Sequence, residues 1–579
     1  MRGILKYAKP YAFYMFITLI FKFIAAIMDL LIPSLLAKII DDIVPLKDVA
    51  QICFWGGVMI FCAVMSAGVN ITANRMAEVS AGGMTRQIRY DLFSKTTYLS
   101  AGQLDDFTIP SVVSRLTSDT YNVNRMLARM QRLGVRGPIL LVGGILITLS
   151  MEPKLTLVLV ASLPIIILIV SIVTCKSVPI YDRQQTVLDE MVRVLRENIT
   201  GVRVIRAFSK TEYEKERFDA VNYRLSDVER KAGSISAASN PSTTLVLNLG
   251  LVAVIVTGAF LVQNGETGPG VIIAFLSYFT IILNAMLGIT KIFIMCSKGI
   301  ASARRITQVL EAEDDMLINQ SNGFGKSPAE AEQPHVEFRN VSFSYFHKED
   351  NLKDISFSLK KGETLGIIGP TGSGKSTMIQ LLLRFYDADS GSILIDGQNI
   401  NTIPFPELRG RFGVVFQNDF LMAQSIEDNI DYFRGLSPER IEEAADYAQA
   451  KDFISKKQDN MQSEVAVRGN NLSGGQRQRI MIARALAAKP EILILDDASS
   501  ALDYETDRKV RRALKEHFAD TTSIVVAQRI SSIRNADHIL VLEEGRSIGY
   551  GSHEQLLESC PSYRQIHELQ MGTSKEVKV

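Results

Sequence analysis

The sequence has almost no excess charge of either sign. Its 579 residues carry 63 Lys and Arg against 62 Asp and Glu, which leaves a formal net charge of +1. A protein that is drawn to nucleic acid or to an acidic surface usually carries a basic excess, and this chain has no such global field. We therefore expect no nucleic-acid partner.

Cysteine is also scarce and follows no pattern. The chain has five, with neither a Cys-x-x-Cys pair nor the spacing of metal ligands, and we interpret them as buried thiols. A small-residue cleavage site is missing after the first apolar stretch, so we expect a retained membrane span there and no removable signal peptide. The cysteines are Cys53, Cys62, Cys175, Cys296 and Cys560.

Long apolar runs fill the first half of the chain and are missing from the second half. A chain of this length is too long for one hydrophobic core, so at least two domains are expected. The change in composition predicts a membrane domain over 1–304, a linker over 305–334, a soluble domain over 335–571 and a polar, disordered tail over 572–579. Over 323–333 the linker is rich in Gly, Ser, Pro, Ala and Glu.

Six apolar stretches are long enough to cross a bilayer, which takes about 20 residues. Lys and Arg accumulate on the cytoplasmic side of membrane proteins. The short connections between spans hold only Lys47 and Lys154, whereas the two long connections, 73–134 and 176–242, are rich in both. We therefore expect a multi-pass protein of the cell membrane, with both termini and both long helical connections in the cytoplasm. The stretches are 12–40, 51–72, 135–151, 155–175, 243–263 and 270–296.

The predicted spans contain polar residues, among them Lys22, Asp29, Asn248 and Asn284. Polar groups at membrane depth are costly when they face lipid, so they usually face a bundle interior or a water-filled cavity. Lys22 and Asp29 are seven residues apart and share one helix face. Two readings stay open for these residues, a substrate pathway and hydrogen bonding between helices.

The second half contains a phosphate-binding loop. The strand 364–368 precedes the run Gly369-Pro370-Thr371-Gly372-Ser373-Gly374-Lys375-Ser376-Thr377, and an apolar helix follows. This pattern in a strand-loop-helix context predicts ATP binding in an α/β domain. The glycines let backbone N–H groups turn onto phosphate oxygens, Lys375 reaches the outer phosphates, and the Ser376 hydroxyl serves Mg²⁺.

A second motif, Leu472-Ser473-Gly474-Gly475-Gln476, opens another helix, which Ser473 can cap. With the phosphate loop before it and the strand Ile492–Asp496 after it, the chain resembles the ATP-binding cassette (ABC) family, and LSGGQ is the signature of that family. The first half is similar to the six-helix domain of the exporter type. The resemblance implies that Ser114–Asp119 and Gly201–Phe208 lie in segments that dock onto nucleotide-binding domains.

The resemblance also assigns single residues. Tyr345 matches the aromatic that stacks on adenine, and Gln417 matches the glutamine that touches Mg²⁺. Asp496 matches the metal-associated aspartate, and Asp503 lies in the loop that communicates across a dimer of cassettes. Together with Ser376, Gln417 and Asp496 make up the expected metal site, and ATP and Mg²⁺ are the expected cofactors.

The chain departs from the family pattern at two catalytic positions. After Asp496 the family normally has a glutamate that acts on the attacking water, and here the residue is Asp497. The usual histidine of the switch loop is Gln528. A general base contributes about 10² to 10⁴ in rate, and a misplacement of about 1 Å can cost about 10². We expect a site that holds ATP and hydrolyses it slowly.

In the family, each ATP lies between the phosphate loop of one cassette and the signature of the other. Here the chain's own loop would form a degenerate site, and its intact signature would complete the active site of a partner. We therefore expect one half of a heterodimeric bacterial exporter, paired with a second half-transporter. The alternatives are a homodimer with two slow sites and an ATP-gated channel or regulatory subunit. The six spans exclude a soluble cassette protein, and the fusion of spans and cassette disfavours an importer.

The substrate is less constrained by the sequence. Apolar spans with aromatics such as Phe275, Tyr278 and Phe279 suit a hydrophobic or amphipathic substrate, which includes drugs, lipids and peptides. Multidrug export is the commonest role among similar proteins, and this is an analogy. No peptidase domain precedes the first span, so a leader-cleaving peptide exporter is a weaker expectation.

Overall fold

The computed structural model describes residues 2–313, 315–316, 333–345, 350–417 and 420–571. These residues form two compact units. The first comprises 1–98 and 108–312, and the second comprises 99–107 and 313–579. The predicted linker lies largely outside the described residues, and the predicted polar tail lies wholly outside them.

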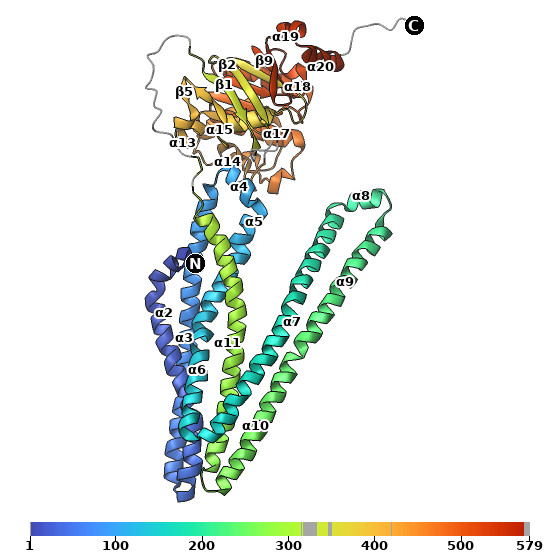
Figure 1. Ribbon diagram of the computed structural model, residues 1–579. Coiled ribbons are helices and arrows are strands. Elements are labelled where there is room, and N and C mark those ends of the chain that lie inside the picture. The colour runs from blue at the N-terminus through green and yellow to red at the C-terminus, as the bar shows by residue number, and fades with distance from the viewer. Residues whose placement is uncertain (1, 314, 317–332, 346–349, 418–419, 572–579) are drawn as a thin grey trace. The chain divides into compact units, whose positions relative to one another are not determined.

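The first unit is entirely helical in its described part, and its long helices are shown in Figure 1. Six candidate membrane spans are present, as predicted. The helices are α1 (Arg2–Leu5), α2 (Ala12–Lys38), α3 (Val49–Thr97), α5 (Ile109–Ser114), α6 (Thr120–Met151), α7 (Pro153–Thr200), α8 (Val202–Ala207), α9 (Thr211–Ala237), α10 (Ser239–Gln263) and α11 (Pro269–Leu310).

Hydrogen bonds and ion pairs join α2 to its neighbours at membrane depth. The buried Lys22 ammonium donates to Asn70 Oδ1 at 2.5 Å and to Asn74 Oδ1 at 2.7 Å, both on α3. Asp29 pairs with Arg136 of α6. Interhelical hydrogen bonding is thus what the structure shows for Lys22. Asn248 is exposed on α10.

Two of the five cysteines are exposed, so the expectation that all of them are buried thiols is wrong. Cys62 and Cys560 are buried and Cys296 is half-buried, but Cys53 and Cys175 are exposed. Cys53 and Cys175 lie on α3 and α7, on helices that carry candidate spans. An outward-facing apolar thiol suits a helix surrounded by lipid, so burial within the protein is not required there.

One short helix of the first long connection belongs to the second unit. Helix α4 (Ala101–Phe107) is grouped with the soluble residues, and Tyr386 Oη donates to its Asp105 Oδ2 at 2.7 Å. The expected docking run, Ser114–Asp119, belongs instead to the helical unit, where Asp119 pairs with Arg305 of α11. Docking of the connections that contain Ser114–Asp119 and Gly201–Phe208 onto nucleotide-binding domains stays a prediction.

The second unit contains two sheets. The smaller has the order β2-β1-β4-β5 with antiparallel pairs, and the larger has the order β10-β9-β3-β8-β7-β6 with parallel pairs except at β10. The strands are β1 (Val336–Phe343), β2 (Leu352–Leu359), β3 (Thr364–Ile368), β4 (Ser390–Ile395), β5 (Gln398–Asn399), β6 (Phe412–Val415), β7 (Ile492–Asp496), β8 (Thr522–Val526), β9 (His538–Glu543) and β10 (Arg546–Gly551).

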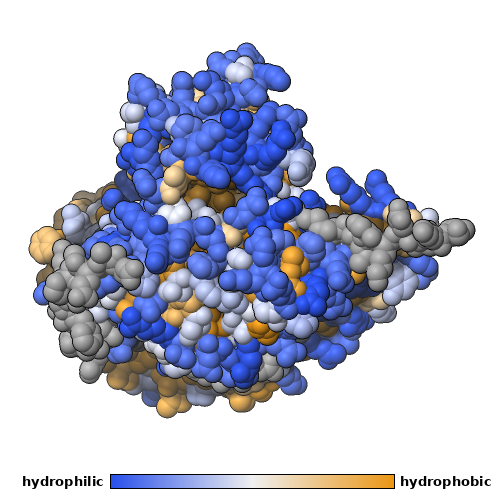
Figure 2. Space-filling view, turned by 90° about the horizontal axis from the view of Figure 1, so that it is seen from above, coloured by the Kyte–Doolittle hydropathy of each residue, from blue (hydrophilic) through white to orange (hydrophobic). Residues whose placement is uncertain are grey.

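Helices cover these sheets and separate the hydrophobic cores. Helix α12 follows β3, and its apolar face packs into a core shared by both sheets. The face seen in Figure 2 is mostly hydrophilic, with hydrophobic residues in small groups. The helices are α12 (Lys375–Leu382), α13 (Phe405–Gly410), α14 (Ile426–Asp431), α15 (Pro438–Tyr447), α16 (Lys451–Ile454), α17 (Gly474–Ala487), α18 (Tyr504–His517), α19 (His553–Ser559) and α20 (Pro561–Met571).

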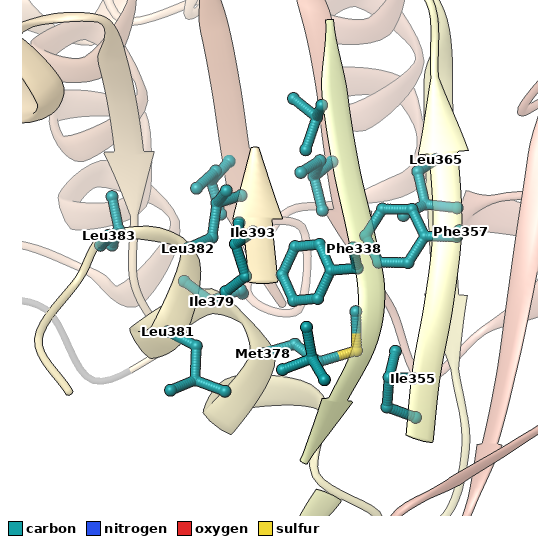
Figure 3. Packing of buried hydrophobic residues seen from close by; sticks show 14 of the residues in the cluster. Phe338, Ile355, Phe357, Leu365, Met378, Ile379, Leu381, Leu382, Leu383 and Ile393 are labelled. Carbon is teal, nitrogen blue, oxygen red and sulfur yellow. The ribbon is translucent and has the colours of Figure 1, made fainter. Parts of the chain in front are cut away.

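The core around α12 fixes the position of the loop that precedes it. In Figure 3, Met378 lies next to Phe338, and Ile379 and Leu382 lie beside Ile393. Phe338 and Phe357 are stacked, with ring centroids 4.6 Å apart and planes 20° apart. Because α12 is held on its apolar face by both sheets, its N-terminal end cannot shift without disturbing this core.

The stacked pair generates a stability prediction. Phe338→Ala should lower the free energy of unfolding by about 3–5 kcal/mol, since a buried ring is lost and a cavity remains. The measurement is thermal unfolding of the purified full chain by scanning calorimetry. The exposed Tyr504→Ala change serves as the control and should shift the transition little. Equal shifts for both variants would contradict the packing described here.

Candidate functional site

The candidate site lies at one edge of the large sheet. Strands β3, β8, β7 and β6 are parallel neighbours, so their carboxyl ends lie together. Open parallel sheets bind ligands outside the carboxyl ends of their strands. Each of these four strands is followed at once by predicted site residues, and a cavity of about 540 Å³ is lined by residues from all four connections. They are Gly369 to Gly372, Gly374 to Thr377, Gln417, Asp496, Asp497 and Gln528.

The phosphate loop has the backbone conformation for which glycine is needed. Gly372 has φ +85° and Gly374 has φ +99°, both in the left-handed region. A Cβ at Gly374 would lie 2.5 Å from the Leu352 side chain and 2.9 Å from the Asn351 carbonyl oxygen. The loop therefore approaches β2 as closely as a bare backbone allows, and α12 starts directly after it.

Lys375 and Ser376 begin α12 and point back to the loop and the sheet. Lys375 Nζ donates to the carbonyl oxygens of Gly369 at 2.9 Å and Pro370 at 2.7 Å. Ser376 Oγ donates to Asp496 Oδ2 at 3.1 Å. A hydroxyl and a carboxylate are thereby placed side by side at the end of β7.

The two residues that depart from the family pattern touch each other. Gln528 Nε2 donates to Asp497 Oδ2 at 3.0 Å. Asp497 has φ +53°, a conformation that Asp tolerates better than most residues. Its backbone is held as well, because its N–H donates to Val526 O at 3.0 Å and its carbonyl accepts from Gln478 Nε2 at 3.2 Å. Both side chains line the cavity next to the phosphate loop.

Burial shifts the proton affinities of the three charged groups in the cavity. Burial raises the pKa of Asp496 and that of Asp497 above their ordinary values. Asp497 adds to the increase at Asp496, while Ser376 and Lys375 oppose it. Burial also lowers the pKa of Lys375, against the attraction of the two carboxylates. The cavity therefore favours a bound cation beside Asp496 and a bound anion beside Lys375.

These residues fit the groups expected from the sequence. Left-handed glycines, a helix N-terminus and Lys375 suit a phosphate chain. The Ser376 hydroxyl, the Asp496 carboxylate and the nearby Gln417 amide offer the oxygen ligands that Mg²⁺ prefers. Their roles as ligands remain predictions.

Several predicted residues do not line this cavity. Ser373 is buried behind the loop, and its N–H donates to Pro370 O at 3.2 Å. Half-buried Tyr345 lines a different cavity of about 360 Å³, with its ring edge-on to Phe343 and Tyr386. Its hydroxyl donates to Gln380 Oε1 at 2.5 Å. The expected stacking of Tyr345 on adenine remains a prediction.

The signature residues also lie outside this cavity and cap a helix. Ser473 Oγ accepts from Gln476 N at 3.3 Å, and the Gln476 side chain accepts from Ser473 N at 3.0 Å, which is a capping box at the start of α17. Gly474 and Gly475 follow the cap. Asp503 caps α18 in a similar way, through Thr506 N at 2.9 Å. Ser473 and Asp503 are exposed.

Other residues of the site were not found from the sequence. Asn351 and Ile566 line the cavity, and Gln478 accepts from Ala501 N at 2.9 Å while it holds Asp497. Gln570 of α20 bonds both Gln528 O and Ile530 N at 2.7 Å. Isolated Asn, Ile and Gln residues belong to no sequence motif, so the sequence offered no reason to select them. Only the position of Gln478, two residues beyond the signature, could have suggested a role.

Known families match both halves of the chain. Residues 15–286 match the family described as ABC transporter transmembrane region, and residues 352–500 match the family described as ABC transporter. The chain is 34% identical over 566 residues to an uncharacterised ABC transporter ATP-binding protein of Mycobacterium tuberculosis, covering 97% of this chain and 96% of that protein. It is 31% identical over 502 residues to an ATP-dependent lipid A-core flippase of Vibrio vulnificus, covering 85% and 84%.

A solved structure shares the fold. The structure of a bacterial Atm1-family ABC exporter with ATP bound superposes with a TM-score of 0.80 and is 23% identical, covering 98% of this chain and 99% of that chain. The predicted fold class, six membrane helices fused to an α/β cassette, is thereby confirmed. From the sequence similarity over its full length and the two matched domains, the chain belongs to the ABC transporter family.

Proposed function

We propose that this chain is one half of a heterodimeric ABC exporter that uses ATP to move a hydrophobic or amphipathic substrate out of the cell. Its own phosphate loop forms a site that holds ATP and hydrolyses it slowly. One observation carries this proposal. The phosphate loop is complete, while the residue that should activate water is an aspartate already bonded to Gln528.

Two features should slow hydrolysis: the Asp497 side chain is short, and the Gln528 side chain cannot transfer a proton. Aspartate is shorter than glutamate by one methylene, so the Asp497 carboxylate lies farther from a water placed beyond the outer phosphate. One of its oxygens accepts the Gln528 amide at 3.0 Å. A glutamine amide does not change its protonation state near neutral pH, whereas the histidine of the family can. ATP binding is supported by Lys375 and the phosphate loop, which keep the residues of the family pattern.

The partner is proposed from the signature. The signature residues do not line the chain's own cavity. Ser473, which caps α17, is exposed, and Gly474, Gly475 and Gln476 in the first turn are half-buried. In the family, a signature completes the site of the opposite cassette. The intact signature of this chain would therefore serve a partner half-transporter with glutamate and histidine at the two altered positions. That partner's site would carry out most of the hydrolysis.

The membrane unit supports export of an apolar or amphipathic substrate. It contains a cavity of about 550 Å³ between spans. One relative is named a lipid A-core flippase, which supports a lipid-like substrate more directly than a drug. Multidrug export remains the wider form of the proposal. We place both termini, the cassette and the long connections in the cytoplasm on the strength of the Lys and Arg distribution.

The ATPase activity of the purified chain tests the slow site. The chain alone should hydrolyse ATP slowly. The double change Asp497→Glu and Gln528→His should raise its turnover by about tenfold or more, since a placed general base is worth about 10² to 10⁴. Turnover and ATP affinity are measured in lipid nanodiscs. Asp459→Glu, an exposed aspartate, is the matched control and should change neither.

The same assay tests the heterodimer. Co-purification with a half-transporter that carries the catalytic glutamate should give brisk hydrolysis, and changing that glutamate should abolish it. Lys375→Ala should remove ATP binding at this chain's loop. Brisk hydrolysis by the unmodified chain alone would overturn the proposal of a degenerate site and favour a homodimer.

The buried charge of Asp496 gives a prediction about pH. Burial raises its pKa in the folded chain above the ordinary 3.8, so ionised Asp496 lowers stability above the raised pKa. Below 3.8 the group is neutral in both states and the penalty is absent. Without nucleotide and Mg²⁺, Asp496→Asn should therefore melt at a higher temperature than the unmodified chain at pH 7, and the difference should shrink as the pH falls and vanish below 3.8.

Adding Mg²⁺ and ATP should reverse that order at pH 7, because the cation would compensate the carboxylate only in the unmodified chain. Thermal unfolding at several pH values measures both effects. The control is Asp459→Asn, which removes an exposed charge. A melting temperature of Asp496→Asn that equals that of the control at every pH would contradict this account of the site.

A further inference from the structure

The cavity in the membrane unit has apolar walls and one charged end. It lies between α2, α6 and α11, and its volume is about 550 Å³. Most of its lining is apolar, whereas Asp29 and Arg136 meet at one place on its wall, with Asn284 and Ser277 contributed by α11. The apolar lining includes Ile32, Leu36, Leu133, Leu140, Ile281 and Ala285.

The ion pair presents hydrogen-bond donors to the cavity more than acceptors. Asp29 Oδ1 accepts from Ser66 Oγ at 2.5 Å, and Asp29 Oδ2 accepts from Arg136 Nη2 at 2.5 Å. Both carboxylate oxygens are therefore engaged. A guanidinium has five N–H donors, and Arg136 uses one of them for Asp29. Its Nε is buried without a hydrogen-bond partner, but the side chain as a whole is 31% exposed and lines the cavity, so donors of its terminal nitrogens are within reach of a ligand.

Arg136 is the last of four arginines on one face of α6. Arg125, Arg129, Arg132 and Arg136 follow one another at spacings of four, three and four residues, which places them on one helix face. Arg125 and Arg129 are exposed, and Arg125 lies over the Tyr121 ring at 5.4 Å. These four arginines form a basic stripe along α6, which ends at Arg136 on the wall of the cavity.

The acidic groups that face this stripe are few. Glu78 of α3 pairs with Arg132, and Asp29 of α2 pairs with Arg136. Helices α6 and α11, which form two of the cavity's walls, contain no Asp or Glu over their full lengths. On α2 and α3 the buried Lys22 ammonium adds a further positive charge beside Asn70 and Asn74. The surroundings of the cavity are therefore net positive.

From these observations we infer that the cavity binds an amphipathic anion. A phosphate or carboxylate headgroup is held by Arg136, and the apolar tail lies against Leu36, Leu140 and Ile281. Charge-assisted bonds from a guanidinium to such a headgroup are strong and can be bidentate. This inference rests on the proposed export function, since it names the chemical class of the exported substrate.

A purely structural reading of the arginines predicts something different. Basic residues accumulate at one end of membrane helices, and ion pairs between spans hold a bundle together. In that reading Asp29 and Arg136 support each other, so losing either should do the same damage. If Arg136 instead serves a ligand, Asp29 competes with that ligand, and the two losses act in opposite directions.

Binding of fluorescent amphiphiles tests this difference. The full chain in phosphatidylcholine nanodiscs, without ATP, is titrated with tail-labelled dodecyl phosphate, dodecylphosphocholine and dodecyltrimethylammonium, and anisotropy reports binding. Dodecyl phosphate should bind at least about tenfold more tightly than the trimethylammonium compound. Arg136→Gln should weaken dodecyl phosphate binding by about tenfold or more, and Asp29→Asn should strengthen it.

Two further variants keep the result interpretable. Arg136→Lys retains the charge and should retain part of the affinity if the protein is folded. Arg183→Gln removes an exposed arginine of α7 and should change nothing. Equal weakening by Arg136→Gln and Asp29→Asn would overturn the inference, and so would tighter binding of the trimethylammonium probe.

A transport assay separates this inference from the proposed function. It measures ATP-driven uptake of the same probes into inverted vesicles that contain both the chain and its partner. Binding of dodecyl phosphate by the single chain, with no ATP-driven transport by the pair, would retain the inference and overturn export. ATP-driven transport of the cationic probe alone would retain export and overturn the inference.

Discussion

The parallel register of four neighbouring strands is the constraint on which the soluble unit depends. Strands β3, β8, β7 and β6 all run in one direction, so each chain segment leaves the sheet at the same edge. This register brings together the phosphate loop, Gln417, Asp496, Asp497 and Gln528, which are far apart in the sequence. The core around Phe338 and Met378 then fixes α12, so the register and the packing together determine where a phosphate chain can lie.

Buried carboxylates are compensated in different ways in the two units. In the cassette, burial raises the pKa of Asp496 beside a hydroxyl, and the predicted cation would compensate its charge. In the membrane unit, Asp29 is compensated within the protein by Arg136 and Ser66. A buried carboxylate without compensation is costly in both places. The cassette leaves its charge for a ligand to compensate, while the membrane unit compensates its acids and leaves basic groups exposed.

The sequence predicted what motifs and periodicity encode. Six spans follow from run lengths, and the phosphate loop follows from its glycines, because φ values such as +99° at Gly374 restrict the residue type. Long-range side-chain contacts could not be predicted. Nothing in the local sequence places Gln570 on Gln528, or Asp105 on Tyr386, since these contacts depend on tertiary packing. The same limit explains why the sequence could not single out α4 as a helix that belongs with the soluble unit.

Under the proposed function, the pair Asp497 and Gln528 lowers turnover without disturbing the fold. Asp497 has φ +53°, which aspartate tolerates better than glutamate, and its carboxylate, carbonyl and N–H all have partners. Three hydrogen bonds therefore hold the aspartate in place. A base worth about 10² to 10⁴ in rate corresponds to roughly 3–5 kcal/mol of barrier, and this loss falls on the transition state alone. ATP binding depends on Lys375 and the loop, so a site of this kind can close on nucleotide and remain closed while another site sets the rate.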